Sequence, residues 1–212
     1  AKEKSKSRIE RELAHRPAGA RDARARLADL DQEGIWGEVV YPSLGLWEPL
    51  IEDRSLVVAA ARAENEWRLR EIQELAPDRL VVGASVPLLD VGDAVAEVER
   101  AMGAGFHMVS LPCCPPVGVP AWNDDGWEPL WSVAEEAGAV LGFHIGGQDP
   151  SADATPYRGP GGAVINYAET TYSGQRVATQ LVASGALDRH PDLRILISEA
   201  GATWVPFMGD RM

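Results

Sequence analysis

Val140-Leu141-Gly142-Phe143-His144-Ile145-Gly146 is the stretch that indicates the fold most directly, because a short apolar run here ends in a histidine and a glycine. A second run, Leu193 to Gly201, has the same form and reaches Glu199 before its glycine. Short apolar runs of this kind are typical of buried strands. In parallel α/β proteins, ligands and catalytic side chains gather at the carboxyl ends of strands. His144 and Glu199 are therefore the first candidates for a functional site.

Helix-like and strand-like segments alternate along the rest of the chain, without hairpin turns between them. The predicted helices cover residues 24–30, 56–75, 91–104, 127–137 and 163–187, with another beginning near 202. The predicted strands cover residues 35–41, 80–87, 106–112, 139–144 and 193–199. This alternation predicts a parallel sheet with right-handed crossovers. Because the strands are almost continuously apolar, we expect both faces of the sheet to be covered.

A doubly wound sheet and a (β/α)₈ barrel both satisfy this pattern. No strand leads into a G-x-G-x-x-G or G-x-x-x-x-G-K-[ST] loop, which argues against a nucleotide-binding sheet. The nearest run, Gly159-Pro160-Gly161-Gly162, follows a loop instead. Five predicted strands are too few for a whole barrel, and 212 residues fall below the roughly 250 that the fold usually needs.

Composition indicates one globular domain over residues 1–212, with residues 1–16 as a basic tail. The chain is 45% hydrophobic and 25% charged, which is ordinary for a folded protein. Its net charge of -12 is uneven, because the first 26 residues carry nine basic against four acidic side chains and the remainder carries 11 against 28. An acidic body repels phosphate backbones and anionic lipids. We therefore expect no nucleic-acid partner and no membrane partner.

Other sequence features favour a cytoplasmic location. No run approaches the roughly 18 apolar residues of a membrane span, and the amino end has no secretory signal pattern. The two cysteines, Cys113 and Cys114, are adjacent, which suits neither a disulfide framework nor a spaced zinc site. We expect them to be reduced thiols in a loop.

The order of several short motifs resembles the amidohydrolase 2 family, the branch of the amidohydrolase superfamily that includes aminocarboxymuconate-semialdehyde decarboxylase. The resemblance covers most of the chain from about Arg16 onward. It is carried by Glu38-Val39-Val40-Tyr41-Pro42-Ser43-Leu44-Gly45-Leu46, Ala61-Arg62-Ala63-Glu64-Asn65-Glu66-Trp67, Ala76-Pro77-Asp78-Arg79-Leu80, Val86-Pro87-Leu88-Leu89-Asp90, Gly142-Phe143-His144-Ile145-Gly146, and His190-Pro191-Asp192-Leu193 with Trp204-Val205-Pro206.

The resemblance implies a (β/α)₈ barrel of the metal-dependent hydrolase type that holds one divalent metal ion, zinc or manganese. His144 matches the metal-binding histidine of the fifth barrel strand. Glu199 stands where the decarboxylases carry a sixth-strand histidine for acid–base work. The implied activity is that of a metal-dependent hydrolase or non-oxidative decarboxylase of a small carboxylic acid. The implied assembly is a homodimer or a higher homo-oligomer.

The chain departs from the family pattern at both ends. It contains no H-x-H pair of the kind that the first barrel strand supplies, and it stops soon after the predicted sixth strand, before the eighth-strand aspartate. The resemblance therefore implies an incomplete barrel that lacks the first and last strands. Three readings remain open: a piece of a longer metal enzyme, a metal-free enzyme of the same fold that uses Glu199, and a non-catalytic barrel remnant that acts in assembly.

Each candidate also has a purely structural interpretation. His144 can be a hydrogen-bonded core histidine, and Glu199 can be the ion-pair partner of a structural arginine. Tyr41 and Ser43, at the end of the first predicted strand, face the site if the barrel is right. The remaining residues have structural expectations: His107 in its strand, His190 in a turn, Asn65 and Trp67 against the barrel, and Trp122, Trp127, Trp131 and Trp204 in packing, with Trp122 alternatively at a substrate mouth. The 146–162 loop is expected to cover the site.

Overall fold

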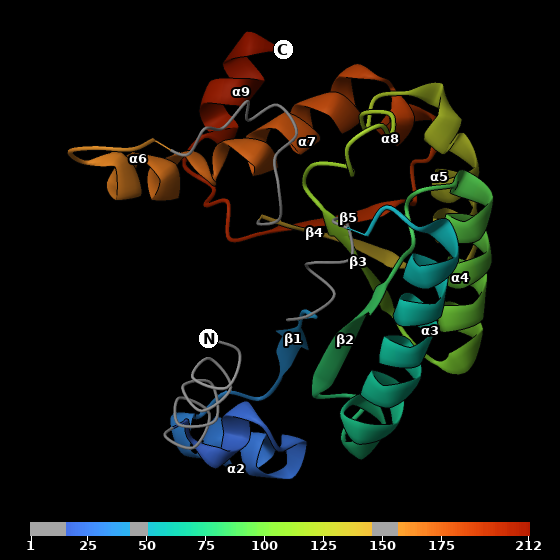
Figure 1. Ribbon diagram of the computed structural model, residues 1–212, viewed down its shortest axis with the longest axis vertical. Coiled ribbons are helices and arrows are strands. Elements are labelled where there is room, and N and C mark those ends of the chain that lie inside the picture. Colours follow the sequence, from blue (N-terminus) through green and yellow to red (C-terminus); the bar gives the residue numbers. More distant parts are fainter. Residues whose placement is uncertain (1–15, 43–50, 146–156) are drawn as a thin grey trace.

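The computed structural model describes residues 16–42, 51–145 and 157–212. One curved sheet contains five parallel strands, with helices on its convex side (Figure 1). The strands follow one another without a reversal of order, whereas a doubly wound sheet has a switch point. The predicted incomplete (β/α)₈ barrel is therefore confirmed as a five-stranded part of a barrel wall. The strands are β1 (Glu38–Val40), β2 (Leu80–Ser85), β3 (Met108–Pro112), β4 (Val140–His144) and β5 (Arg194–Ser198).

The pairing register aligns the carboxyl ends of β3, β4 and β5. Pro112 pairs with His144, and His144 pairs in turn with Ser198. Because these strands are parallel, the three residues form one row at the edge where the strands end. Cys113 extends this row, since its backbone N–H donates to the His144 carbonyl over 3.1 Å. The chain segments that follow the three strands therefore leave the sheet side by side.

The connecting helices begin and end at residues that suit helix termini. The side chains of Asp22, Asp53 and Asp90 accept hydrogen bonds from backbone N–H groups of the first turn of their helices. Gly34 and Gly105 end two helices in the left-handed conformation that glycine adopts without a steric penalty. The helices are α2 (Ala23–Glu33), α3 (Arg54–Glu71), α4 (Val91–Ala104), α5 (Glu128–Glu136), α6 (Gly162–Glu169), α7 (Tyr172–Ala183), α8 (Ala186–Arg189) and α9 (Val205–Arg211), with 3₁₀ turns at Ala18–Ala20, Gln73–Leu75 and Asp125–Trp127.

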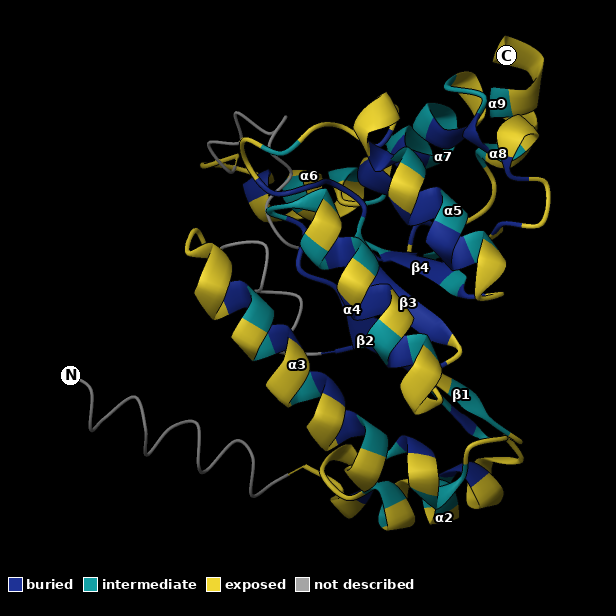
Figure 2. Cartoon of the chain, turned by 90° about the vertical axis from the view of Figure 1, so that its right-hand side faces the viewer, coloured by how far each residue is buried: buried dark blue, intermediate teal, exposed yellow. Residues whose placement is uncertain are grey.

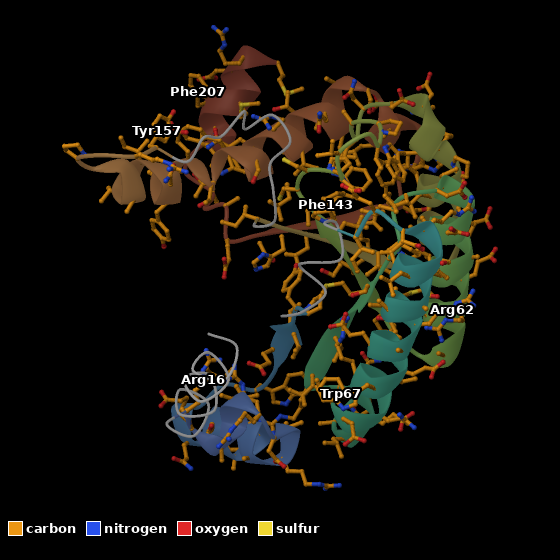
Figure 3. The ribbon with its side chains drawn as sticks, in the orientation of Figure 1. Arg16, Arg62, Trp67, Phe143, Tyr157 and Phe207 are labelled. Atoms are coloured by element: carbon orange, nitrogen blue, oxygen red, sulfur yellow. The ribbon has the colours of Figure 1, made fainter. Side chains whose placement is uncertain are left out.

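The main hydrophobic core lies between the sheet and its helices. Leu141 and Phe143 of β4 belong to it, and Phe143 lies at the centre of the structure (Figure 3). Trp122 meets the Phe143 ring edge-on at 5.4 Å, and its indole N–H donates to the Pro112 carbonyl over 3.1 Å. Helices α4 and α5 alternate buried and exposed stripes (Figure 2). The predicted packing role of Trp122, Trp127 and Trp131 is confirmed, and full burial takes Trp122 away from any substrate mouth.

A buried polar network joins α3 and α4 to β2. The Asn65 side chain donates to the Ser85 carbonyl over 2.9 Å and to Glu97 over 2.7 Å, and it accepts the Ser85 N–H over 2.8 Å. All three residues are buried, so these bonds satisfy groups that would otherwise lack water. Asn65 packs against the barrel as predicted. The same prediction is wrong for Trp67, which is half exposed.

Two predicted elements differ from those in the structure. Residues 163–187 form α6, α7 and α8 rather than one helix, because the hydroxyls of Thr170 and Thr171 bond back to the carbonyls of Tyr167 and Ala168 between the first two. Gly185, in the left-handed conformation, separates α7 from α8. The first strand is shorter than predicted, because only residues 38–40 pair with β2.

Some predictions fall outside the described part of the chain. They concern residues 1–15 of the basic tail, Ser43, and residues 146–156 of the loop expected to cover the site. Within the described residues, no helix combines the length and the apolar composition that crossing a bilayer requires.

His190 does more than form the predicted turn, because it ties the start of β5 to α5. Its side chain is buried, with Nδ1 at 2.9 Å from Glu135 and Nε2 at 2.9 Å from Glu128. Burial alone would lower the pKa of His190, but the two carboxylates outweigh it and raise the pKa above the ordinary value. The pKa of Glu128 is lowered to about 2, mainly by hydrogen bonding from Arg189. Hydrogen bonding from His190 adds to this effect, and partial desolvation of Glu128 opposes it.

Replacing His190 with glutamine should destabilise the fold more at pH 6 than at pH 9. The raised pKa means that the stabilising contribution of the His190 imidazolium is complete below the unfolded-state pKa of about 6.5, and is lost as the pH rises through the folded-state pKa. At pH 6 we expect a loss of about 1.5–3 kcal/mol in the free energy of unfolding, the range for hydrogen bonds to charged groups. Urea unfolding at both pH values measures it.

The matched control is His107→Gln, because His107 is an exposed histidine that lies just before β3. This control should leave the free energy of unfolding nearly unchanged at both pH values. A His190→Gln deficit that stays constant or grows from pH 6 to pH 9 would contradict the proposed charge interaction.

Candidate functional site

His144 and Glu199 meet at the carboxyl edge of the sheet. His144 is the last residue of β4, and Glu199 follows directly after Ser198, the last residue of β5. The parallel register that pairs His144 with Ser198 thus brings the two side chains together, with 3.6 Å between His144 Nε2 and Glu199 Oε1. The two residues selected from the sequence are therefore neighbours in the structure.

The backbone fixes which ring nitrogen of His144 carries the proton. The Nδ1 atom is in hydrogen-bond contact with the carbonyl oxygen of Ile145. Because a carbonyl can only accept, Nδ1 must be the donor in this contact, and in a neutral ring the lone pair is then on Nε2. That lone pair is on the atom nearest the Glu199 carboxylate. His144 Nε2 and Glu199 Oε1 would then both be acceptors, and two acceptors 3.6 Å apart are compatible when a proton or a cation lies between them.

Glu199 has an unusual backbone and an open environment. Its φ of 61° lies in the left-handed region, which costs a residue with a side chain on the order of 1 kcal/mol and is found at functional sites. Its side chain is 66% exposed, against 12% for His144. The side chain that it meets is His144, and no arginine pairs with it within the described residues.

Tyr41 completes the same side of the site from the opposite strand. It directly follows β1, yet its hydroxyl accepts a 2.7 Å hydrogen bond from Ser198 of β5. Its ring centroid lies 4.7 Å from that of His144. Burial raises the pKa of Tyr41, and the Ser198 hydrogen bond only partly opposes this effect. The expectation that Tyr41 faces the site is thus consistent with its contacts.

Gly142 leaves the space through which Tyr41 reaches β5. A Cβ atom built on Gly142 would lie 2.9 Å from the Tyr41 hydroxyl oxygen, 3.0 Å from Met108 Sδ and 3.2 Å from the Val109 carbonyl oxygen. A methyl group does not fit at these distances. Because strand side chains alternate between faces, His144, two residues further on, lies on the same face as Gly142.

Two residues near the site were not among the sequence candidates. Ser198 orients Tyr41, and the backbone N–H of Cys113 donates to the His144 carbonyl. Both stand at or just after the carboxyl end of a predicted strand, and that position was the available signal. Cys113 and Cys114 are both buried, and Arg176 Nη1 lies 3.9 Å from Cys114 Sγ.

The pair formed by His144 and Glu199 fits part of a divalent metal site. One imidazole nitrogen and one carboxylate oxygen are both ligands that zinc and manganese accept. A catalytic site usually takes about three protein ligands. Across residues 16–42, 51–145 and 157–212, no group of three or more histidine, cysteine, aspartate or glutamate side chains is placed to hold an ion. The described residues therefore supply one side of such a site.

Comparison of the sequence with known proteins gives a family and a relative. Residues 43–212 match the family model described as amidohydrolase. The chain is 28% identical over 209 residues to the gamma-resorcylate decarboxylase of Rhizobium sp. (strain MTP-10005), an alignment that covers 93% of this chain and 60% of the relative. The chain thus spans about 60% of the length of the curated relatives that it matches.

Comparison of the structure with solved structures gives the same fold. An amidohydrolase from Mycobacterium avium subsp. paratuberculosis K-10 superposes with a TM-score of 0.77 at 25% identity, covering 94% of this chain and 53% of that protein. A dihydroxybenzoic acid decarboxylase from Polaromonas sp. JS666, solved with bound manganese and the inhibitor 2-nitroresorcinol, gives a TM-score of 0.64 at 22% identity, covering 81% and 52%. This second likeness shows the fold alone.

Replacing Gly142 with alanine should destabilise the protein by about 1–3 kcal/mol, the range for overpacking a tight interior. The new methyl group would press on the Tyr41 hydroxyl and on the Val109 backbone, neither of which can move freely. Thermal or urea unfolding measures the loss.

Gly83→Ala is the matched control. There the nearest atom is the terminal methyl carbon of Met108, at 2.8 Å, which can rotate away, although Ser110 Cβ at 3.1 Å must also shift slightly. We expect a smaller loss than for Gly142→Ala. An equal or larger loss for Gly83→Ala would contradict the expectation that the neighbours of Gly142, Tyr41 among them, are less able to shift than those of Gly83.

Proposed function

The chain belongs to the amidohydrolase family, as its resemblance indicated, and from that membership we propose that the protein is a metal-dependent decarboxylase or hydrolase of a small aromatic carboxylic acid. Non-oxidative decarboxylation is the reaction that we place first. The relative that aligns with 93% of this chain decarboxylates gamma-resorcylate, an aromatic acid, according to its name. In this proposal His144 binds the metal ion, and Glu199 holds the proton that the reaction moves.

The observation that carries the proposal is the facing pair of His144 and Glu199. The Ile145 carbonyl leaves the lone pair of His144 on Nε2, the ring atom that lies 3.6 Å from the Glu199 carboxylate. A hydrogen bond from Nδ1 to a carbonyl is the usual support of a metal-binding histidine. The remaining ligands would come from outside the described residues, since these contain no complete ligand group.

A bound divalent ion polarises a carboxylate and lowers the pKa of a coordinated water to near 7. Zinc and manganese both accept an imidazole ligand such as His144. The structure of the Polaromonas decarboxylase contains manganese, which supports including that metal in the proposal.

The need for a proton donor follows from the stoichiometry of decarboxylation. Loss of CO₂ breaks the bond between the ring carbon and the carboxyl carbon, and the electron pair stays on the ring carbon. That carbon must then form a C–H bond, so an acid has to stand next to it. Glu199 is the acid at this edge, beside His144 and largely exposed. Its carboxyl group can take a proton from solvent and pass it to the ring.

The metal-free alternative has less support in the geometry. A glutamate that works alone as a general base near neutral pH needs burial or a neighbouring acid to raise its pKa. The Glu199 side chain is 66% exposed and lies beside a histidine instead. The metal-free alternative therefore lacks the buried carboxyl group on which it would depend.

The proposal includes a single barrel domain that assembles as a homodimer or higher homo-oligomer in the cytoplasm. Large apolar side chains are exposed on α6 and α9, among them Tyr167 and Phe207, and association would cover them. Light scattering of the purified protein should give at least twice the chain mass, and a monomer would reject the assembly.

Replacing His144 with alanine in the full-length protein should abolish retention of zinc or manganese and, with it, release of CO₂ from gamma-resorcylate. Elemental analysis and a CO₂ assay measure the two effects. Glu199→Gln should keep more of the metal and still lower the rate by about 10²–10⁴-fold, the range for a positioned acid–base group.

Two exposed residues provide matched controls, His107→Ala and Glu136→Gln, and both should keep the metal and the activity. Unchanged metal content in His144→Ala would reject His144 as a ligand. Activity that survives exhaustive chelation in the unaltered protein would instead favour the metal-free alternative.

A further inference from the structure

The Tyr41 hydroxyl lies within the candidate site, although Tyr41 is far in sequence from the residues it meets. Its oxygen is hydrogen-bonded to Ser198, 157 residues further along the chain, and its ring packs against the His144 ring. It therefore reaches across the concave side of the sheet from β1 to β5. The absence of a side chain at Gly142 makes this path possible. The hydroxyl is thus held beside both His144 and the strand that leads to Glu199.

The hydrogen bonding of this hydroxyl leaves its proton available. A phenolic oxygen can accept a hydrogen bond and donate one at the same time. Ser198 Oγ donates to Tyr41 Oη over 2.7 Å, so the serine uses the acceptor capacity of the tyrosine. Within the described residues, the Tyr41 hydroxyl itself donates no hydrogen bond. The proton can therefore be donated to a ligand on the concave side.

We propose that Tyr41 is a substrate-binding residue that donates its O–H to a carboxylate oxygen of the aromatic acid, and that Ser198 orients it for this purpose. The inference rests on the proposed function and adds a recognition residue to the same site. The ligand class is a benzoate-type anion, whose ring lies within reach of Glu199 and whose carboxylate lies on the side of His144 and Tyr41.

The placement suits recognition of the carboxylate rather than of the ring. A tyrosine O–H is a neutral donor that pairs with an anionic oxygen in a short, charge-assisted hydrogen bond. The Tyr41 ring lies next to His144, the residue that we propose as the metal ligand. A metal ion bound there would also attract the carboxylate. If a cation is bound at His144, one carboxylate oxygen would be held by it and the other would accept the hydrogen bond from Tyr41.

The serine limits the freedom of the tyrosine. Tyr41 lies just past the three-residue strand β1, which pairs only with β2. Without the bond to Ser198, the hydroxyl would be held mainly by the packing of its ring on His144. The two contacts together fix the donor in one position before a ligand arrives, which reduces the entropy lost on binding.

The test compares two ligands that differ only in the carboxylate. Titration calorimetry with the metal-loaded, full-length protein measures the dissociation constants of gamma-resorcylate and of resorcinol, which lacks the carboxylate. Tyr41→Phe should weaken gamma-resorcylate binding by about 10–100-fold, the effect of losing a hydrogen bond to a charged group, and should leave resorcinol binding unchanged. Tyr167→Phe, on the exposed side of α6, should change neither constant.

A second variant separates recognition from support. Ser198→Ala keeps the Tyr41 hydroxyl and removes the group that orients it, so it should weaken gamma-resorcylate binding less than Tyr41→Phe does. Circular dichroism and the unfolding temperature of each variant verify that the fold is intact.

The possible results lead to different conclusions. Equal losses for gamma-resorcylate and resorcinol in Tyr41→Phe would make Tyr41 a structural support and overturn the inference, and so would unchanged binding of gamma-resorcylate. Failure of the unaltered, metal-loaded protein to bind or decarboxylate any benzoate-type acid would reject the proposed function itself, and this inference with it.

Discussion

Parallel pairing of β4 with β3 and β5 in one register is the constraint on which the site depends. The register puts Pro112, His144 and Ser198 in one row, so the residues that follow the strands are neighbours in space despite their separation in sequence. A shift of β5 by one residue would turn Ser198 to the other face and remove its contact with Tyr41. The helices that bury the convex side secure this register, because Leu141 and Phe143 would leave the core if β4 moved.

The two faces of β4 meet opposite requirements. Leu141 and Phe143 fill the space between sheet and helices with large apolar side chains, as a stable core requires. Gly142, between them, must carry no side chain at all, because Tyr41, Met108 and the Val109 backbone already occupy the space above it. The strand therefore combines large residues toward the helices with a small residue toward the site. The short run Val140–His144 encodes the packing of the core and the access of Tyr41 to β5 together.

The alternation of apolar strands with helices predicted the sheet, its parallel order and most element boundaries. Because Asp90 and Gly105 are typical capping residues, the predicted ends of α4 agree with those in the structure. The split of residues 163–187 was missed because threonine hydroxyls compete for backbone carbonyls only in a particular local geometry. At the site, strand ends indicated His144 and Glu199, but the contact of Tyr41 with Ser198 depends on the curvature of the sheet. The exposure of Glu199 likewise depends on the tertiary structure.

The charge of the chain explains why local donors matter for the proposed ligand. With a net charge of -12, the protein as a whole repels an anionic aromatic acid. Salt reduces this repulsion beyond roughly 8–10 Å, so binding is decided by groups closer than that. Glu199 places a further carboxyl group at this range, next to His144. In the proposed function, a cation at His144 and a neutral donor such as the Tyr41 hydroxyl would together offset the repulsion of an anionic ligand. The acidity of the protein thus explains, as much as the fold does, why the proposed metal ligand would be paired with an oriented tyrosine.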